Sequence, residues 1–547
     1  MSESKRVSRR RPAAASTNSD EGFADWSNAI AQLVQNLPVA IFNLIETLLR
    51  AEDEHEAPQG KGNGAGKKAK RKRLSDDDLF AFGGLLKQAL EELRYEVESN
   101  RKDAIALMER LRQHLLEAGQ RPDVNLKTFF FVLQQFAVAK LDIGGELRAL
   151  AEQLLGNWAE SSSAGDEPTI EELTKDLKKL AGAMKGNPFA IHAEVFEFTL
   201  ALPADVRAAL VTSVLAQKDV PGLRDAALGW LLDDAAEVRQ TVAQFLEKDA
   251  GNNSGATLRR MIALRNWVPE ADRPALDRAI KASQKKVACA SWPSAKVLEA
   301  YASGYDGSGA QSVFMVVAQG RKRVLASLLF KQDIGVRDAW VGSGSTQAEL
   351  SATLEALGTQ MELLPVPLEY AGAATRHFLG VNAQAGVLPP FGLLDVAEAA
   401  GLTNVNPAFQ PVEALLSSLC AGIEPERTTP QAIAKALKTS ASWADKLGTV
   451  SSWFEANDEI DAVLARGRLS KAKRKAALLA MPLQKRRHWW AALIAWTGYT
   501  LKHAPYPSGW EDYVLVAREL LGSRPLDEFG IMNGIAEATL ANSTGRG

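Results

Sequence analysis

Two clusters of basic residues are the parts of this 547-residue sequence whose side chains could bind a charged ligand. The first cluster follows a glycine-rich stretch and comprises Lys67, Lys68, Lys70, Arg71, Lys72 and Arg73. The second lies between 466 and 487 and comprises Arg466, Arg468, Lys473, Arg474, Arg486 and Arg487. Lysine and arginine bind nucleic-acid phosphates through charge, without reading the sequence of bases. Each cluster is therefore a candidate phosphate contact, with a solvated charged face as the alternative.

The glycine-rich stretch does not have the spacing of a P-loop. A P-loop ending in Gly66-Lys67 would need a glycine where Lys61 stands, and Lys68 replaces the Ser or Thr that binds magnesium. The surrounding residues 51–74 contain few apolar side chains and cannot bury a core. We therefore expect a flexible charged linker there, with a non-specific phosphate-binding arm as the alternative.

Aromatic residues follow the second basic cluster directly. Basic side chains beside aromatic rings can bind phosphates while the rings stack on bases. However, Trp489, Leu493 and Trp496 recur every three or four residues, which is also typical of a buried helical face. We favour a core position for the aromatic rings, and leave the basic side chains open between a solvated and a phosphate-facing role.

No familiar catalytic or metal-binding pattern is present in the sequence. It contains no HExxH, no GxSxG and no GxGxxG after a predicted strand. The six histidines are scattered without a carboxylate or cysteine at ligand spacing. Cys289 follows two lysines that could lower its thiol pKa, but a free cysteine is more often buried and inert. We therefore expect no enzyme activity, no cofactor and no metal ion.

Composition sets broad limits on location and partners. The net charge is −2, so no global field draws the chain to nucleic acid or membrane. The two cysteines are far apart in sequence, and the first residues are basic without the apolar stretch of a secretory signal. No run of eighteen apolar residues is present, so we expect no membrane span and a cytoplasmic location.

The stretch 220–247 indicates how the chain is built. Leu223, Ala227 and Trp230 recur at helical spacing, and Asp233-Asp234 then supplies a turn and helix-capping oxygens. A second helix with Val238 inward is expected from about Ala236. Such short helix pairs cannot bury their apolar faces alone and need stacked neighbours. We expect three pairs, at about 188–217, 221–247 and 257–283, with Val206, Val238 and Leu276 facing inward.

The acidic turn followed by Val238-Arg239 resembles the HEAT-repeat family over about residues 187–286. The resemblance implies an α-solenoid in which Asp233, Arg207, Arg239 and Arg273 form a ladder of polar contacts between repeats. The positions six residues before Arg207 and Arg273 hold Ala201 and Trp267, so the acidic member is missing from the expected place there. HEAT proteins are mostly binding scaffolds, although a fold does not fix a function.

The remaining chain divides by composition and periodicity, and the whole is expected to be mainly α. The expected parts are a disordered N-terminus at 1–21, an amphipathic docking helix at 22–50, the linker at 51–74, a helical bundle at 75–160, HEAT-like repeats at 169–290, a small β-hairpin element at 300–345, and a helical region at 346–547. In the hairpin element, 335–340 is expected to form the turn that follows the second strand.

These features favour a non-enzymatic scaffold that binds a protein partner through a solenoid surface. The alternative is a nucleic-acid-associated protein that uses the basic segments 61–73 and 466–487. A continuous positive groove would favour nucleic acid, whereas a surface of mixed charge would favour a protein partner.

Overall fold

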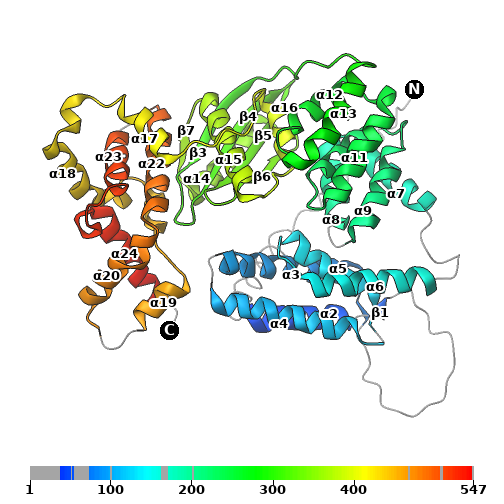
Figure 1. Cartoon of the computed structure of the whole chain (residues 1–547), viewed down its shortest axis with the longest axis horizontal. Helices are drawn as coiled ribbons and strands as arrows, with labels where there is room; N and C mark the ends of the chain where they lie inside the picture. Colours follow the sequence, from blue (N-terminus) through cyan, green and yellow to red (C-terminus); the bar gives the residue numbers. More distant parts are fainter. Residues whose placement is uncertain are drawn as a thin grey trace, which may run out of the picture. The chain divides into compact units, whose positions relative to one another are not determined.

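The computed structural model describes residues 37–50, 52–53, 73–74, 76–98, 101–122, 124–161, 170–199, 202–465, 469–505 and 509–544. They fall into two compact units, Met1–Ser162 with Glu197–Ala201, and Ser163–Phe196 with Leu202–Gly547. Most described residues are helical (Figure 1), so the expected mainly-α class is confirmed. Within the described part of the chain, no helix is long and apolar enough to cross a membrane. The predicted disordered segment 1–21 lies outside the described residues.

The first unit is a bundle of helices around one apolar core. Its helices are α2 (Leu37–Leu49), α3 (Asp76–Glu98), α4 (Lys102–Gly119), α5 (Leu126–Val138) and α6 (Gly145–Ser161). Ile41, Ile45 and Leu48 of α2 are fully buried in the same core as Phe129 and Phe136 of α5. The prediction of a separate docking helix is therefore wrong for residues 37–49, because their apolar face is already covered within the bundle.

The residues at the two ends of the predicted linker lie next to each other. Strand β1 (Glu52–Asp53) pairs in parallel with β2 (Arg73–Leu74), and α2 packs against α3. The two ends of the segment 54–72 are therefore held together. Apart from these two strands, the predicted flexible linker 51–74 lies outside the described residues.

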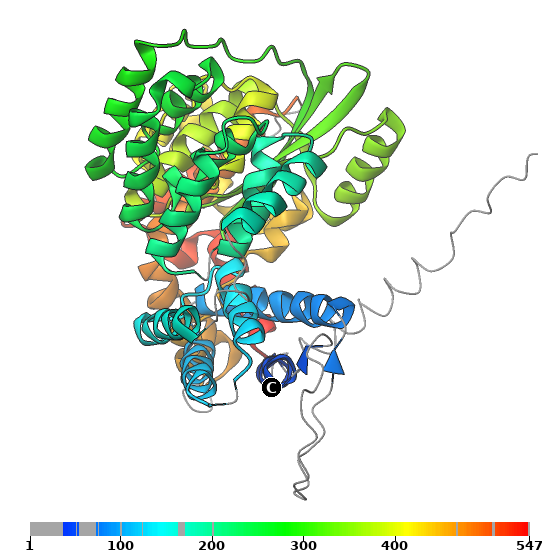
Figure 2. The same ribbon diagram turned by 90° about the vertical axis from the view of Figure 1, so that its right-hand side faces the viewer.

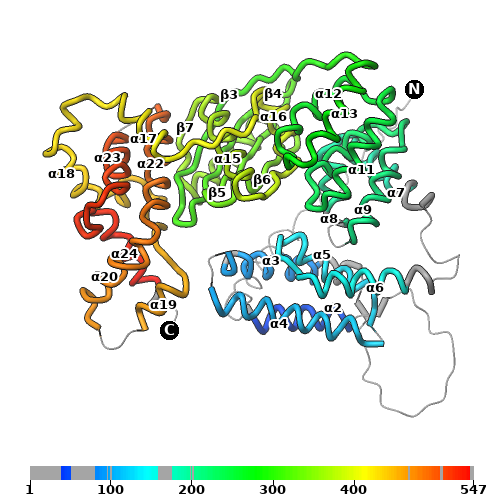
Figure 3. The backbone as a smooth tube through the Cα atoms, viewed as in Figure 1, coloured from blue at the N-terminus to red at the C-terminus, as the bar shows by residue number. Residues whose placement is uncertain are grey.

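The second unit begins with short helices packed side by side (Figures 1 and 3). They are α7 (Ile170–Ala183), α8 (Pro188–Thr199), α9 (Ala204–Leu215), α10 (Leu223–Ala226), η1 (Ala227–Leu232), α11 (Ala236–Lys248), η2 (Ala250–Asn252), α12 (Gly255–Leu264), η3 (Glu270–Asp272) and α13 (Arg273–Gln284). Helix α11 contacts α9 and α13, and Val238 and Leu276 are buried as predicted. Val206 is 38% exposed, because its neighbour Arg207 turns inward instead.

The segment 223–232 differs from the expected amphipathic helix. It forms one α-helical turn followed by a 3-10 helix, and every residue from Ala227 to Leu232 is buried. A Cβ atom on Gly229 would lie 2.2 Å from the ring of His192, so only glycine permits this close approach. The 3-10 part of this segment is therefore covered on all sides.

A five-stranded antiparallel sheet follows, in the order β6-β5-β4-β3-β7. Its strands are β3 (Val297–Ser303), β4 (Ala310–Gln319), β5 (Lys322–Lys331), β6 (Gly335–Val341) and β7 (Leu363–Pro365). The predicted hairpin is the central pair β4–β5, but the predicted turn at 335–340 is strand β6. The Asn382 side chain accepts from the Val336 N–H and donates to the Ile334 carbonyl, at 2.8 and 2.9 Å. Asn382, from a helix that follows later in the chain, thus supplies hydrogen-bond partners to backbone groups at the start of β6. Residues 335–340 alone do not show this partner.

The two faces of the sheet are covered differently (Figure 2). Helices α15 (Leu368–Ala385) and α16 (Gly392–Ala400) cover the face that carries Val313 and Met315, within the main core. Helix α14 (Gln347–Gln360) covers part of the opposite face, where Phe314 and Val316 form a separate small core.

The C-terminal helices complete the main core. They are α17 (Val412–Cys420), η4 (Pro425–Thr428), α18 (Pro430–Thr439), η5 (Ser440–Asp445), η6 (Gly448–Ser452), α19 (Asp458–Leu464), α20 (Lys471–Ala480), α21 (Pro482–Lys485), α22 (Arg487–His503), α23 (Trp510–Leu520), η7 (Leu526–Glu528) and α24 (Gly530–Thr544). Trp496 of α22 is buried, as the spacing predicted, and so is Trp490. Trp489, which the same spacing placed in the core, is only half-buried, and its indole N–H donates to Asp333 at 3.0 Å. The core is continuous through the predicted parts 169–290, 300–345 and 346–547, so they form one unit.

We expect Trp230→Ala to lower the free energy of unfolding by about 3–5 kcal/mol, because removing a buried indole leaves a cavity. Trp230 is 1% exposed and meets His192 edge-on, with ring centroids 4.8 Å apart. Urea denaturation followed by circular dichroism measures the loss. Val206→Ala, at an exposed position, is the control, and an equal loss in both variants would contradict this packing.

Candidate functional site

A chain of buried arginines connects successive helices of the second unit. Arg207 of α9 reaches Asp233 in the turn before α11 through two hydrogen bonds, Nε–Oδ2 at 3.0 Å and Nη2–Oδ1 at 2.8 Å. The same guanidinium donates to the Leu202 carbonyl at 2.6 Å. Burial raises the pKa of the Asp233 carboxyl, and the positive charge of Arg207 opposes that rise. The bidentate geometry fixes the distance and rotation between the two helices.

The next link has the same form with a different acidic partner. Arg239 of α11 binds Asp272 with Nε–Oδ2 at 2.7 Å, and also donates to the Asp233 carbonyl at 2.6 Å. The sequence has Trp267 where an acidic residue was expected in this turn. The acidic residue of the turn is Asp272, five positions later. Arg273, predicted as a ladder residue, donates to the Val268 carbonyl at 3.3 Å. It holds its own turn and makes no described ion pair to a following helix.

A second row of polar contacts lies beside the first. Arg224 donates to Asn253 Oδ1 at 2.7 Å and to Asp249 Oδ2 at 2.8 Å. The amide of Asn253 then donates to Ser283 Oγ at 2.7 Å. Three consecutive helix pairs are thus joined by hydrogen bonds on two levels, and sequence reasoning missed this second row.

The largest buried charge cluster joins the helix pairs to α16. Glu398 accepts from Arg259 Nη2 at 2.7 Å and from Arg260 Nη2 at 2.8 Å, while Arg260 Nη1 reaches Asp225 at 2.9 Å. Burial alone would raise the pKa of Glu398, but hydrogen bonds and charge from Arg260 and Arg259 hold it below its usual value. Burial, with a smaller effect of Glu398, raises the pKa of nearby Asp395 to about 7.

Charge balance explains the divergent pKa values of the two carboxyls on α16. Arg259 and Arg260 supply two positive charges, which Asp225 and Glu398 neutralise. An ionised Asp395 would add a third negative charge in a desolvated place, so its neutral form is favoured. Divergent carboxyl pKa values can mark an acid–base pair. Here Glu398 joins α16 to the two arginines of α12, so the arrangement fits a structural link between these helices.

Most basic residues of the predicted phosphate-binding segment that the structure describes have intramolecular partners. Arg486 lies 4.1 Å from the ring centroid of Trp489 and 2.7 Å from Glu455, and Lys485 lies 2.6 Å from Glu459. Arg487 donates to three carbonyls around the end of α23, including that of Arg524 at 2.7 Å. Lys473 is exposed and Arg474 is half-buried on α20. The described cluster is therefore a face of mixed charge.

The other predicted phosphate contacts cannot be placed. Lys67, Lys68, Lys70, Arg71 and Lys72 lie outside the described residues, as do Arg466 and Arg468. Only the backbone of Arg73 is described, in β2.

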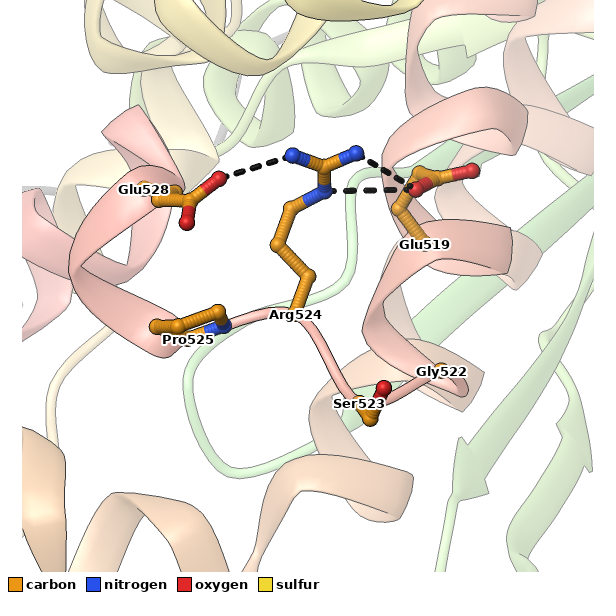
Figure 4. A pocket seen from close by; sticks show the side chains of 6 residues that line it. All are labelled: Glu519, Gly522, Ser523, Arg524, Pro525 and Glu528. Atoms are coloured by element: carbon orange, nitrogen blue, oxygen red, sulfur yellow. Dashed lines mark hydrogen bonds and ion pairs between the residues drawn. The ribbon is translucent and has the colours of Figure 1, made fainter.

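A shallow depression near the end of α23 offers little to an anion (Figure 4). Arg524 projects into it, but Nη1 already donates to Glu528 at 2.7 Å and Nε to Glu519 at 3.3 Å (Figure 4). Because both carboxylates also line the depression, an anionic ligand would meet them as well as the guanidinium.

Buried tyrosine, glutamine and threonine side chains join the sheet to α22. The Tyr370 hydroxyl lies 2.7 Å from both Gln311 Oε1 and Thr500 Oγ1. Gln311 Nε2 donates in turn to the Ser303 carbonyl at 2.9 Å. Burial raises the pKa of Tyr370, which keeps its hydroxyl protonated as a donor. These residues come from four separate segments, and no sequence spacing connected them.

The histidines and cysteines do not assemble into a reactive centre within the described part of the chain. Burial lowers the pKa of His192 to about 3 and that of His377 to about 4, so both rings are neutral at pH 7. Among the described residues, no group of three or more His, Cys, Asp or Glu side chains could hold a metal ion. Cys289 is exposed, so the favoured buried position was wrong.

We expect Asp233→Asn to lower the free energy of unfolding by about 3–5 kcal/mol, because it leaves the buried Arg207 charge without its main counterion. Thermal or urea unfolding provides the measurement. Asp234→Asn is a matched control, since Asp234 also contacts Arg207 but its side chain is 88% exposed, and we expect a loss below about 1 kcal/mol. Equal effects of the two variants would contradict a structural role for the buried pair.

We expect Asp395→Asn to stabilise the protein more at pH 8 than at pH 5. The native pKa of Asp395, about 7, lies above its unfolded value, so the native state binds more protons between these values. Stability is therefore lost as pH rises through that range, by up to about 4 kcal/mol. Melting temperatures of both proteins across pH 5–8 test this, with Glu355→Gln on exposed α14 as control. A variant-to-wild-type difference independent of pH would contradict the assignment.

Comparison with known proteins finds two matching family models. Residues 203–287 match the Y4lR second domain, and residues 413–544 match the Y4lR C-terminal helical domain. The uncharacterized protein y4lR of Sinorhizobium fredii is 25% identical over 391 residues, which cover 70% of this chain and 74% of that protein. No solved structure matches the chain. The first matched stretch contains the arginine links of α9, α11 and α13, and the second contains α22.

Proposed function

We propose that this chain is a non-enzymatic scaffold that binds a protein partner through the outer surface of α9, α11 and α13. The carrying observation is the pair of buried links Arg207–Asp233 and Arg239–Asp272. They hold consecutive helices at fixed spacing, and their side chains point inward. The solvent-facing side chains are left available for a partner. On this proposal the three helix pairs are HEAT-like repeats, in line with the sequence resemblance.

The character of that outer surface supports a protein partner over nucleic acid. Its exposed residues carry both signs, with Glu237 and Lys248 on α11 and Arg278 and Lys281 on α13. Arg278 already contacts Glu247 at 3.2 Å. Nucleic-acid surfaces present a stripe of positive charge, whereas a mixed polar surface is typical of protein interfaces.

Nucleic-acid association is the second candidate, because exposed Lys471 and Lys473 begin α20 next to the undescribed Arg466 and Arg468. Counterion release would make such binding fall steeply with salt concentration.

Affinity capture from a native lysate, with and without nuclease, separates the two candidates. We expect nuclease-resistant capture of a partner, and at least about a tenfold loss on combining Glu237→Lys, Lys248→Glu and Arg278→Glu, because reversed charges repel a complementary surface. Glu355→Lys with Lys435→Glu, elsewhere on the second unit, is the control. Capture unaffected by the first set would contradict this surface.

An electrophoretic shift titration at two salt concentrations tests the alternative. We expect no shift of DNA or RNA at physiological salt. A tight, salt-sensitive complex that is lost when Arg466, Arg468, Lys473, Arg474, Arg486 and Arg487 are neutralised together would instead establish nucleic-acid binding.

A further inference from the structure

Four basic side chains gather at one end of the five-stranded sheet. The hairpin β4–β5 closes there with the pair Gln319–Lys322, and Gly320, with φ +61°, allows the tight turn. Three of the basic residues belong to this hairpin and the fourth precedes β3. We call this set the basic sheet end; its members are Lys296, Arg321, Lys322 and Arg323.

Main-chain hydrogen bonds hold the basic sheet end in a fixed arrangement. The Ala318 N–H donates to the Lys296 carbonyl at 2.9 Å, and Ala318 is the strand partner of Arg323. On its other side, Arg323 exchanges two hydrogen bonds with Ser345, at 2.8 and 3.0 Å. Lys296 and Arg323 are therefore two strand spacings apart, about 10 Å. The sheet thus fixes where these charges stand relative to one another.

The charges of the basic sheet end have no counterion among the described residues. Three of its side chains are exposed, and Arg323 is half-buried. Within the part of the chain that the structure describes, none of the four side chains makes a hydrogen bond or an ion pair. Glu349, in the first turn of α14, has its carboxylate occupied by the Thr346 N–H and hydroxyl, at 2.8 and 2.9 Å. The basic side chains of 485–487, by contrast, all have partners within the chain.

The chemistry of the basic sheet end favours an acidic protein segment over lipid or nucleic acid. The turn from Gln319 to Arg321 has no apolar side chain to insert into a bilayer and no aromatic ring on which a base could stack. Four cations are also fewer than the roughly six to ten phosphate contacts of a typical nucleic-acid complex. Guanidinium groups match carboxylates well, and an extended chain places its like-sided side chains about 7 Å apart. A few acidic residues can therefore meet all four charges.

We propose that the basic sheet end binds an extended acidic segment of a partner protein, through carboxylate contacts to its four basic side chains. The proposal goes beyond the scaffold surface of α9, α11 and α13 and uses other residues, so either can fail without the other.

Photocrosslinking of the full chain with a benzophenone-labelled deca-glutamate peptide tests the site. We expect crosslinks, located by mass spectrometry, within 294–298 or 319–324. Lys296→Glu/Arg321→Glu/Lys322→Glu should lower them at least about tenfold, because attractive contacts become repulsive. Any crosslinks to the basic segment 61–73 are an internal control and should not change. A peptide that crosslinks only outside the basic sheet end would overturn the proposal.

Charge exchange and competition test the class of partner. The triple variant should crosslink a deca-lysine peptide at the same residues, which the wild type should not, whereas Lys435→Glu/Lys438→Glu/Lys446→Glu should leave the deca-glutamate crosslinks unchanged. Because the replaced side chains are exposed and unpaired, the melting temperature of the triple variant should match that of the wild type. A lowered melting temperature would show that these charges serve the fold, and the proposal fails. Oligothymidylate or phosphatidylserine vesicles that suppress the crosslinks at lower concentration than unlabelled deca-glutamate would also overturn it, in favour of nucleic acid or lipid.

Discussion

The arrangement of the second unit depends on neutralising arginine side chains that its helices bury. A guanidinium removed from water is tolerated only when carboxylates and carbonyls of neighbouring elements meet it in good geometry. Arg207, Arg239 and Arg260 are each at most 9% exposed, and each finds its carboxylate on a different element. Apolar packing alone would accept small rotations between helices, whereas a bidentate ion pair does not. The buried charges therefore specify the relative positions of elements that hydrophobic burial stabilises.

The same constraint connects parts that are far apart in sequence. Glu398 on α16 meets Arg259 and Arg260 on α12, so the helix that covers the sheet is also fixed to the helix pairs. At the other end of the sheet, Tyr370 and Gln311 bind Thr500 of α22. Polar contacts thus mark both junctions of one continuous core. Helix α14 packs on the sheet mainly through apolar side chains, of which Leu350 is buried.

Local periodicity predicted much of the secondary structure but little of the tertiary arrangement. The inward position of Val238 and the hairpin β4–β5 could be predicted from the sequence, because both depend on residues close together in the chain. Val206 was misplaced because the phase of its helix is set by Asp233, twenty-seven positions later in the chain. Strand β6 was missed because Asn382 satisfies its edge from a distant helix. The amphipathic segment 37–49 was read as a docking helix, since a sequence shows an apolar face but not what covers it.

In the candidate site, too, the sequence predicted some of the residues but not the partners that come from distant parts of the chain. The sequence singled out Asp233, Arg207 and Arg239, and in the structure Arg207 and Arg239 both donate hydrogen bonds to Asp233. It could not supply Asp272 as the partner of Arg239, or Glu398 as the counterion of the α12 arginines, since these depend on the packing of separate elements. Arg486 and Arg487 looked like phosphate contacts for the converse reason: their carboxylate and carbonyl partners are remote in sequence. Arg486 pairs with the carboxylate of Glu455, whereas Arg487 donates to three backbone carbonyls, and the spacing of a basic run in sequence reveals neither partner.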